Sequence, residues 1–275
     1  MVQSRYPESA VDRGSAGNNL DTAPVPVYGT GVSTIATTID SYLDAPEVKS
    51  LLAGCYAGIS RATIADRFSA AAEALLNLFP EAKSEQIRFI STPGRSELGG
   101  NHTDHNLGCV VAGSIELDAL AALVPTDDNR VRLKSKGFDT LFDVDLSSLD
   151  PKEEEGGTQA LIRGVAARCN ELGYRTGGFL AYVDSKVLPG SGMSSSAAIE
   201  VLLGTAISSL YNNSTIPVVE LAKIGQYAEN EYMGKPCGLM DQIACAHGGV
   251  VGIDFENPEE PVVLGIEVDL AEAGY

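Results

Sequence analysis

Apolar residues that recur every three or four positions predict amphipathic helices in two parts of the chain. The first stretch covers residues 62–79, and Pro80 ends it because proline cannot continue a helix. The second covers residues 158–172, with Thr158 as the expected N-cap and Gly173 as the expected stop. Each helix therefore has one apolar stripe to bury against a neighbouring layer.

Other signals predict three further helices. Residues 197–210 are apolar nearly all round, which indicates a central, buried helix. Another helix follows Pro217 and stops at Gly234, since proline favours helix starts and glycine favours helix ends. Residues 40–53 form a shorter candidate that Pro46 interrupts.

Runs of apolar and β-branched residues between turn residues predict the strands of a sheet. We expect Thr92-Pro93-Gly94 to break the first strand, and residues 109–124 to form a buried strand or hairpin. Strands and helices are mixed without strict βαβ alternation, so we predict an α+β fold with helices packed on one sheet. The predicted strands cover residues 86–91, 109–124, 130–135, 139–144, 178–183, 248–255 and 261–268.

Charge and composition exclude several classes of function. The 275 residues carry a formal net charge of −18, which opposes binding to nucleic acid or an acidic membrane because both need a positive surface. Five scattered cysteines without a CxxC pair predict neither a disulfide framework nor structural zinc. We find no secretory leader and no apolar run long enough to span a bilayer, so we expect a cytoplasmic protein.

The start of the chain differs in composition from the rest. Residues 1–30 are rich in glycine, serine, asparagine and proline, which is typical of poorly ordered segments. We therefore predict an N-terminal extension over residues 1–60, partly disordered or helical, and one domain over residues 61–275. The run of glutamates at 153–155 is interpreted as a solvated link.

A glycine-serine loop precedes the central apolar helix. Its glycines allow positive φ angles and close approach of a ligand, and its serines can cap the helix. The start of a helix also offers free backbone N–H groups and a positive dipole end, which favour phosphate. We predict a phosphate cradle made by Gly190, Ser191, Gly192, Met193, Ser194, Ser195 and Ser196.

A second stretch, residues 93–105, is dense in polar groups between two apolar segments. Arg95 is its obvious cation, and the planar guanidinium suits phosphate, although a surface salt bridge is the plain alternative. His102 and His105 flank Asp104, but this spacing on a loop without a third histidine makes a poor zinc site.

A third stretch, residues 234–242, places Asp241 between apolar neighbours just after a glycine-rich turn. Asp241 is either a base for a hydroxyl proton or an N-cap of the next helix. Upstream, Glu229 lies on the preceding predicted helix. A carboxylate and a hydroxyl near a nucleotide phosphate are typical Mg²⁺ ligands, but Glu229 alone also fits a solvated helix position.

Together these stretches resemble the GHMP small-molecule kinases, and within them the galactokinases. The resemblance lies in Pro-Gly-Arg through Gly-Gly-Asn-His-Thr-Asp at 93–104, Pro-Gly-Ser-Gly-Met-Ser-Ser-Ser-Ala at 189–197, and Ala-Glu through Pro-Cys-Gly-Leu-Met-Asp-Gln at 228–242. It covers about residues 85–270. It implies an ATP-dependent sugar-1-kinase that converts galactose to galactose 1-phosphate, with a small-molecule sugar and ATP as partners.

The resemblance also implies a role for each motif residue. Arg95 would stabilise charge in the transition state, and Asp241 would orient or deprotonate the anomeric hydroxyl. The glycine-serine loop would cradle the ATP phosphates, while Ser196 and Glu229 would hold Mg²⁺. Sugar contacts would come from Asn101, His102, Thr103, Asp104, Gly238 and Asp241.

The implied fold is an α+β N-terminal domain like the second domain of ribosomal protein S5. The ferredoxin-like C-terminal domain of the family is expected to be missing here, so we expect this chain by itself to turn over poorly. Two positions depart from the galactokinase pattern, which has glutamate at Asn101 and an aromatic residue at His105. A kinase for another hexose or an N-acetylhexosamine, or a silent sugar sensor, therefore remains an alternative.

Overall fold

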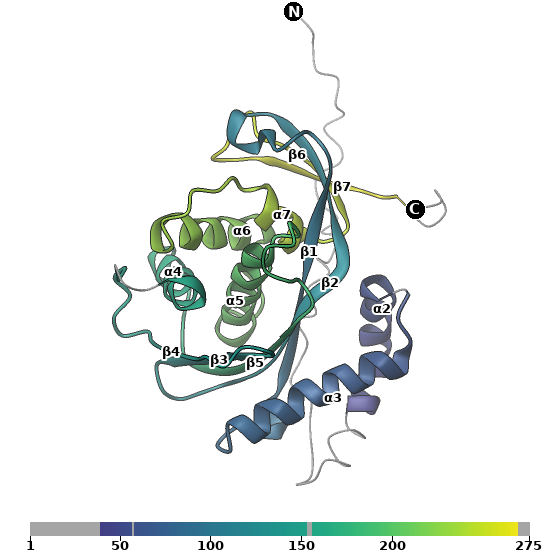
Figure 1. The fold of residues 1–275 in the computed structure, drawn as a ribbon, viewed down its shortest axis with the longest axis vertical. Helices are drawn as coiled ribbons and strands as arrows, with labels where there is room; N and C mark the ends of the chain where they lie inside the picture. Colours follow the sequence, from purple (N-terminus) through teal and green to yellow (C-terminus); the bar gives the residue numbers. More distant parts are fainter. Residues whose placement is uncertain (1–38, 57, 153–155, 269–275) are drawn as a thin grey trace, which may run out of the picture.

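Strand β2 (Cys109–Pro125) is the central strand of one mixed sheet in the computed structural model, which describes residues 39–56, 58–152 and 156–268 (Figure 1). The sheet has seven strands in the order β4-β3-β5-β2-β6-β7, and β1 (Arg88–Gly99) also pairs with β2. Among the strand pairs of the described residues, only β3 and β5 run parallel. The other strands are β3 (Arg130–Ser135), β4 (Leu141–Asp145), β5 (Phe179–Ser185), β6 (Val250–Asp254) and β7 (Val262–Ile266).

Residues 119–124 of strand β2 are apolar without interruption because both faces of the strand are covered there. Ala121 and Leu123 belong to one buried cluster, whereas Leu120 and Val124 belong to another. Successive side chains of a strand point to opposite faces, so the two clusters lie on opposite sides of the sheet. A continuous apolar run is the pattern expected for a strand between two layers.

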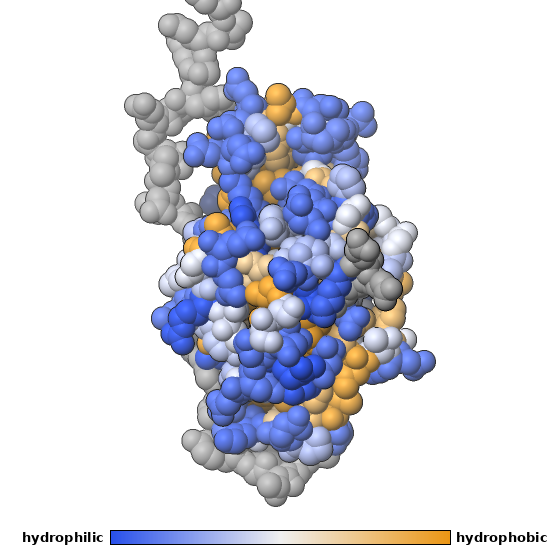
Figure 2. All heavy atoms as spheres, turned by 90° about the vertical axis from the view of Figure 1, so that its left-hand side faces the viewer, coloured by the Kyte–Doolittle hydropathy of each residue, from blue (hydrophilic) through white to orange (hydrophobic). Residues whose placement is uncertain are grey.

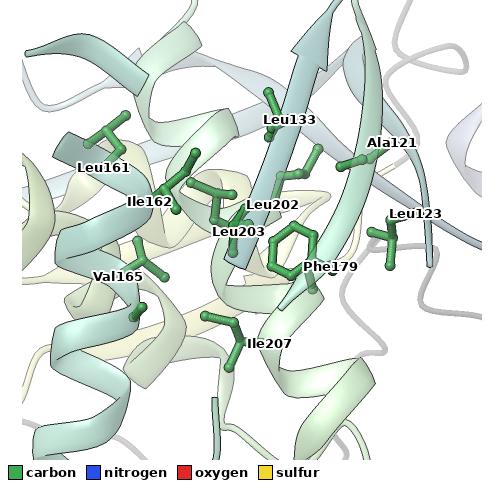
Figure 3. Packing of buried hydrophobic residues seen from close by; sticks show 14 of the residues in the cluster. Ala121, Leu123, Leu133, Leu161, Ile162, Val165, Phe179, Leu202, Leu203 and Ile207 are labelled. Atoms are coloured by element: carbon green, nitrogen blue, oxygen red, sulfur yellow. The ribbon is translucent and has the colours of Figure 1, made fainter. Parts of the chain in front are cut away.

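Four helices cover one face of the sheet (Figure 1). Figure 3 shows Ile162 and Val165 of one helix facing Leu203 and Ile207 of the next, with Leu133 and Phe179 of the strands beside them. The second of these helices is the predicted central helix, and its buried positions lie all round it. The four helices are α4 (Gly157–Glu171), α5 (Ser195–Tyr211), α6 (Val218–Tyr227) and α7 (Met240–His247).

Helices α2 (Pro46–Cys55) and α3 (Arg61–Leu78) cover the opposite face (Figure 1). Ile39, Leu43 and Leu52 are buried in the same cluster as Phe68 of α3. Part of the stretch that we assigned to an N-terminal extension therefore packs in the core of the domain. The expectations for residues 1–38 and 153–155 lie outside the described residues.

The predicted α+β architecture is confirmed, but several element boundaries differ. Gly156, not Thr158, is the N-cap of α4, and Thr158 lies in the first turn. Gly157 has a φ of 60°, so two glycines supply the turn into the helix and no side-chain cap is used. Pro46 begins α2 after a short helical segment at 39–43, as proline suits a first helical turn.

Figure 2 shows a face that is mostly hydrophilic, with scattered hydrophobic patches. Within the part of the chain that the structure describes, every helix is too short or too polar to cross a bilayer.

We expect Phe89→Ala to destabilise the domain by about 3–5 kcal/mol, the usual cost of truncating a buried phenylalanine. Phe89 is fully buried, with its ring centroid 4.8 Å from that of Phe68. Leu78→Ala is the control, because Leu78 is 37% exposed and its truncation should cost less than about 1 kcal/mol. Urea unfolding measures both, and equal losses would contradict this packing.

Candidate active site

Strand β1 carries the first motif past the point where we expected the strand to end. Thr92-Pro93-Gly94 lies inside β1, and the register with β2 shifts between Pro93 and Arg95. The predicted break is wrong because a β-bulge accommodates proline there. Gly94 brings the strand close to the glycine-serine loop, since an added Cβ would lie 2.8 Å from the carbonyl oxygen of Met193.

Arg95 is 8% exposed, and a guanidinium this buried needs hydrogen-bonding partners. Its Nε donates to Asp241 Oδ1 at 2.7 Å, and its Nη1 donates to the carbonyl oxygen of Gly192 at 2.8 Å. Its backbone N–H donates to the Met193 carbonyl at 3.2 Å. One residue of β1 therefore joins helix α7 and the glycine-serine loop, and the surface salt bridge considered from the sequence is excluded.

Asp241 lies in the first turn of α7, and Leu239 is the N-cap residue. The N-cap interpretation of Asp241 is therefore wrong. Its Oδ1 accepts the bond from Arg95, and its Oδ2 accepts a hydrogen bond from the hydroxyl of Ser194. The side chain is 35% exposed, so the carboxylate is held in one orientation and still reaches solvent. This is the arrangement that a positioned base needs.

The glycine-serine loop has the backbone that its composition predicts. Gly190, Gly192 and Ser194 have φ angles of 74°, 76° and 59°. Ser194 is the N-cap residue of α5 but makes no side-chain cap, because its hydroxyl bonds to Asp241 instead. The expected serine cap is thus absent from this helix start. The backbone N–H groups at the N-terminus of α5 and the positive end of its dipole suit an anion.

The serines of this loop have different partners. The hydroxyl of Ser191 donates to the carbonyl oxygen of Leu188 at 2.6 Å, within the turn. In the described parts of the chain, the hydroxyls of Ser195 and Ser196 make no hydrogen bond. These two hydroxyls are therefore the loop's available contacts for a phosphate or a phosphate-bound cation.

The segment that we assigned to the sugar lies in an unusual backbone conformation. Gly100, Asn101 and His102 have φ angles of 115°, 59° and 51° in succession. Asparagine tolerates the left-handed region better than most residues, which gives Asn101 a local reason to occupy its position. The hydroxyl of Thr103 donates to the carbonyl oxygen of Gly100 at 2.9 Å, so Thr103 stabilises the segment from within.

Asp104 brings this segment to the start of α7. Its Oδ2 accepts a hydrogen bond from the backbone N–H of Met240 at 3.2 Å, and its side chain is 8% exposed. Gly238 makes this contact possible, because an added Cβ would lie 1.7 Å from Asp104 Oδ2. The predicted sugar-contacting residues Asp104 and Gly238 therefore lie against each other. Asp104 also bonds to Met240, the residue that precedes Asp241.

The two predicted metal ligands are not in contact. Glu229 lies in a π-helical turn, Ala228–Tyr232, and is 2% exposed. Its Oε1 is 2.6 Å from Lys235 Nζ, and its Oε2 accepts a bond from Gln242 at 3.2 Å. The solvated interpretation of Glu229 is therefore wrong. Among the described residues, no hydrogen bond or ion pair joins Glu229 to Ser196.

Oxygen chemistry at Glu229 nevertheless fits Mg²⁺. The carboxylate already holds one cation, the Lys235 ammonium, and Mg²⁺ prefers carboxylate and hydroxyl oxygens. Glu200 is fully buried beside it, and its Oε1 has no hydrogen-bond partner in the described structure. Burial, followed by the charge of Glu229, raises the pKa of the Glu200 carboxyl well above its usual range.

Several residues of this site were not predicted from the sequence. Gln242 donates to both Glu200, at 2.9 Å, and Glu229, although its proximity to Asp241 in the motif was a signal. Glu200 was also detectable, as the lone carboxylate in an apolar helix. Nothing local marked Glu97, which contacts His102 from β1.

Family models match both halves of this site. The model described as the GHMP kinases N terminal domain matches residues 160–249, which include the glycine-serine loop and Asp241. The galactokinase galactose-binding signature matches residues 77–125, which include Arg95 and Asp104. The chain thus contains a GHMP kinase N-terminal domain and a galactokinase galactose-binding signature. Among the GHMP kinases, the sequence is most plainly similar to galactokinases.

Curated relatives and a solved structure give the extent of this similarity. The chain is 33% identical to the galactokinase of Clostridium tetani over 59% of its own length and 35% identical to that of Lactobacillus helveticus over 64%. These matches span 41% and 46% of the relatives, so the chain covers about half their length. The crystal structure of Lactococcus lactis galactokinase with galactose matches 74% of this chain and 53% of that one, with a TM-score of 0.66 and 27% identity.

More distant structures share the fold. Mevalonate kinase of Methanococcus jannaschii matches 67% of this chain and 57% of its own, with a TM-score of 0.55 and 20% identity. This similarity supports the mixed α+β sheet as the common scaffold, while the chemistry must be argued from the site.

We expect the segment from Asn101 to Asp104 to contact the sugar. Gly238→Ala should then weaken galactose binding by at least about tenfold, because the new methyl group would displace Asp104 and with it this segment. Gly99→Ala is the matched control, since nothing lies within 4 Å of its Cβ position. Titration of each folded variant with galactose tests this, and equal affinity in the two variants would contradict the assignment of this contact.

Proposed function

We propose that this chain provides the sugar- and nucleotide-binding part of an ATP-dependent galactokinase. The reaction transfers the γ-phosphoryl group of ATP to the anomeric hydroxyl of galactose and gives galactose 1-phosphate and ADP. The observation that carries the proposal is the Arg95–Asp241 pair, 2.7 Å apart, placed between the glycine-serine loop and the Asn101–Asp104 segment.

Asp241 supports the first half of this chemistry. Its two carboxylate oxygens are fixed by Arg95 and Ser194, while part of the side chain remains accessible. A fixed carboxylate can orient the anomeric hydroxyl and accept its proton as the oxygen attacks phosphorus. The buried contact of Asp104 with α7 would hold the sugar segment beside this acceptor.

Arg95 supports the second half. Phosphoryl transfer depends mainly on positioning and on stabilising the charge of the transferring group. The guanidinium bonds to the Gly192 carbonyl within the loop that we assign to ATP, so its positive charge lies beside the expected phosphates. A preorganised buried cation needs little rearrangement to stabilise the transition state.

Magnesium belongs to the same proposal. Ser196 and Glu229 are the residues that would hold it, and both offer the oxygen ligands that it prefers. When bound with ATP, Mg²⁺ supplies positive charge to the phosphate oxygens. Lys235 forms an ion pair with Glu229 in this structure. With Mg²⁺ bound, the Lys235 ammonium would either contact the carboxylate together with the metal ion or move away from it.

A sugar panel tests the proposal against its alternatives. The longest natural chain that contains this sequence is incubated with ATP, Mg²⁺ and galactose, glucose, N-acetylgalactosamine or N-acetylglucosamine, and the products are identified by ³¹P NMR. Galactose 1-phosphate as the main product supports the proposal. Preference for another sugar would identify that sugar, and not galactose, as the substrate. Galactose binding without turnover would indicate a sensor.

In the active full-length protein, Asp241→Asn should lower kcat by about 10²–10⁴-fold, the usual contribution of a positioned base. Arg95→Ala should lower kcat by about 10²-fold or more while changing the galactose KM less, because its charge matters most as the phosphoryl group moves. Steady-state kinetics measure both effects. Wild-type kcat in both variants, with folding intact, would refute the assigned roles.

A further inference from the structure

Glu97 contacts His102 at two points of the sugar-binding segment. Glu97 Oε1 accepts a hydrogen bond from the backbone N–H of His102 at 2.8 Å, and Oε2 lies 2.9 Å from the ring Nε2. The Glu97 side chain is 15% exposed, whereas that of His102 is 57% exposed. A largely enclosed carboxylate therefore fixes a residue that faces solvent.

The strand gives this contact a rigid base. Glu97 pairs with Ala112 in the β1–β2 ladder, so its backbone cannot move independently of the sheet. His102, by contrast, has a φ of 51° and follows Gly100 and Asn101, which also have positive φ. Residues other than glycine rarely adopt this backbone conformation, and it persists where surrounding contacts determine it.

The contact also selects a form of the imidazole ring. A carboxylate only accepts hydrogen bonds, so a neutral His102 must carry its proton on Nε2 to bond with Glu97. Nδ1 is then a hydrogen-bond acceptor, and it has no hydrogen-bond partner within the described residues. Carboxylates fix histidine ligands of metals in the same way.

We propose that Glu97 is a positioning residue for substrate recognition. It holds the segment from Gly100 to His102 and fixes the tautomer of His102, so that Nδ1 accepts a hydrogen bond from one hydroxyl of the sugar. This inference rests on the proposed function, because it takes the Asn101–Asp104 segment to be the sugar site.

Two variants separate these roles. Glu97→Ala removes both contacts, so it should release the segment and leave the ring unrestrained. Glu97→Gln keeps a carbonyl oxygen for the His102 N–H but presents an NH₂ group to Nε2, which favours the opposite tautomer with a proton on Nδ1. Glu116→Ala is the matched control, since Glu116 also accepts from a backbone N–H, that of Gly58, elsewhere on the surface.

Kinetics of the full-length protein test the sugar contact. Glu97→Ala and Glu97→Gln should raise the galactose KM at least about fivefold, with kcat and the ATP KM within about twofold of wild type, as expected for lost ground-state binding. In a series of monodeoxygalactoses, the analogue that lacks the hydroxyl bonded to His102 should bind wild type and Glu97→Gln equally, because it cannot make the bond that the variant loses. An unchanged galactose KM in both variants would overturn the proposal. It would also be overturned if Glu97→Gln raised the KM by the same factor for every monodeoxygalactose as for galactose.

Two measurements test the contact without turnover. Imidazole ¹⁵N spectra in alkaline buffer, where an ordinary imidazole is neutral, should show a protonated Nε2 in wild type and a protonated Nδ1 in Glu97→Gln. Amide exchange at His102 should be protected in wild type and Glu97→Gln but fast in Glu97→Ala. Wild type that phosphorylates no sugar would refute the proposed function, whereas identical spectra and exchange in all variants would refute the role of Glu97.

Discussion

The Arg95 guanidinium is a charge enclosed by protein, so its hydrogen-bonding partners decide how the surrounding chain can be arranged. Its Nε bonds to Asp241 of α7, its Nη1 bonds to Gly192, and its backbone N–H bonds to Met193. An enclosed guanidinium left without partners would be destabilising, because a buried charge needs hydrogen bonds to replace those it made with water. The strand, the loop and the helix are therefore placed together.

The orientation of Asp241 follows from this constraint. One oxygen is fixed by Arg95 and the other by Ser194 at the start of α5. The sugar segment reaches the same helix through Asp104 and Met240. The residues that we assign to sugar and to ATP thus share α7 as a common support, and a change at either segment is transmitted to the carboxylate by direct contact.

Local patterns predicted helices α2 to α6 and most strands because burial of one face imposes a period on the sequence. No helix was predicted over Met240–His247, where the structure has α7. The stripe of residues 62–79 and the apolar run of 197–210 became α3 and α5 within a few residues. The motifs identified Arg95 and Asp241, but not their ion pair, which joins positions 146 residues apart. The bulge at Pro93 and the bond from Ser194 to Asp241 depend on such pairing, so no local pattern indicated them. The contact of Glu97 with His102 spans only five residues, but it depends on the positive φ angles of the segment between them.

The coupling free energy between Arg95 and Asp241 tests this account most directly. It is obtained from urea unfolding of wild type, Arg95→Ala, Asp241→Asn and the double variant, as a double-mutant cycle. We predict a favourable coupling of about 1–3 kcal/mol, as expected for contacting residues in one network. Additive single effects, with a coupling within about 0.3 kcal/mol of zero, would show that the pair does not join β1 to α7.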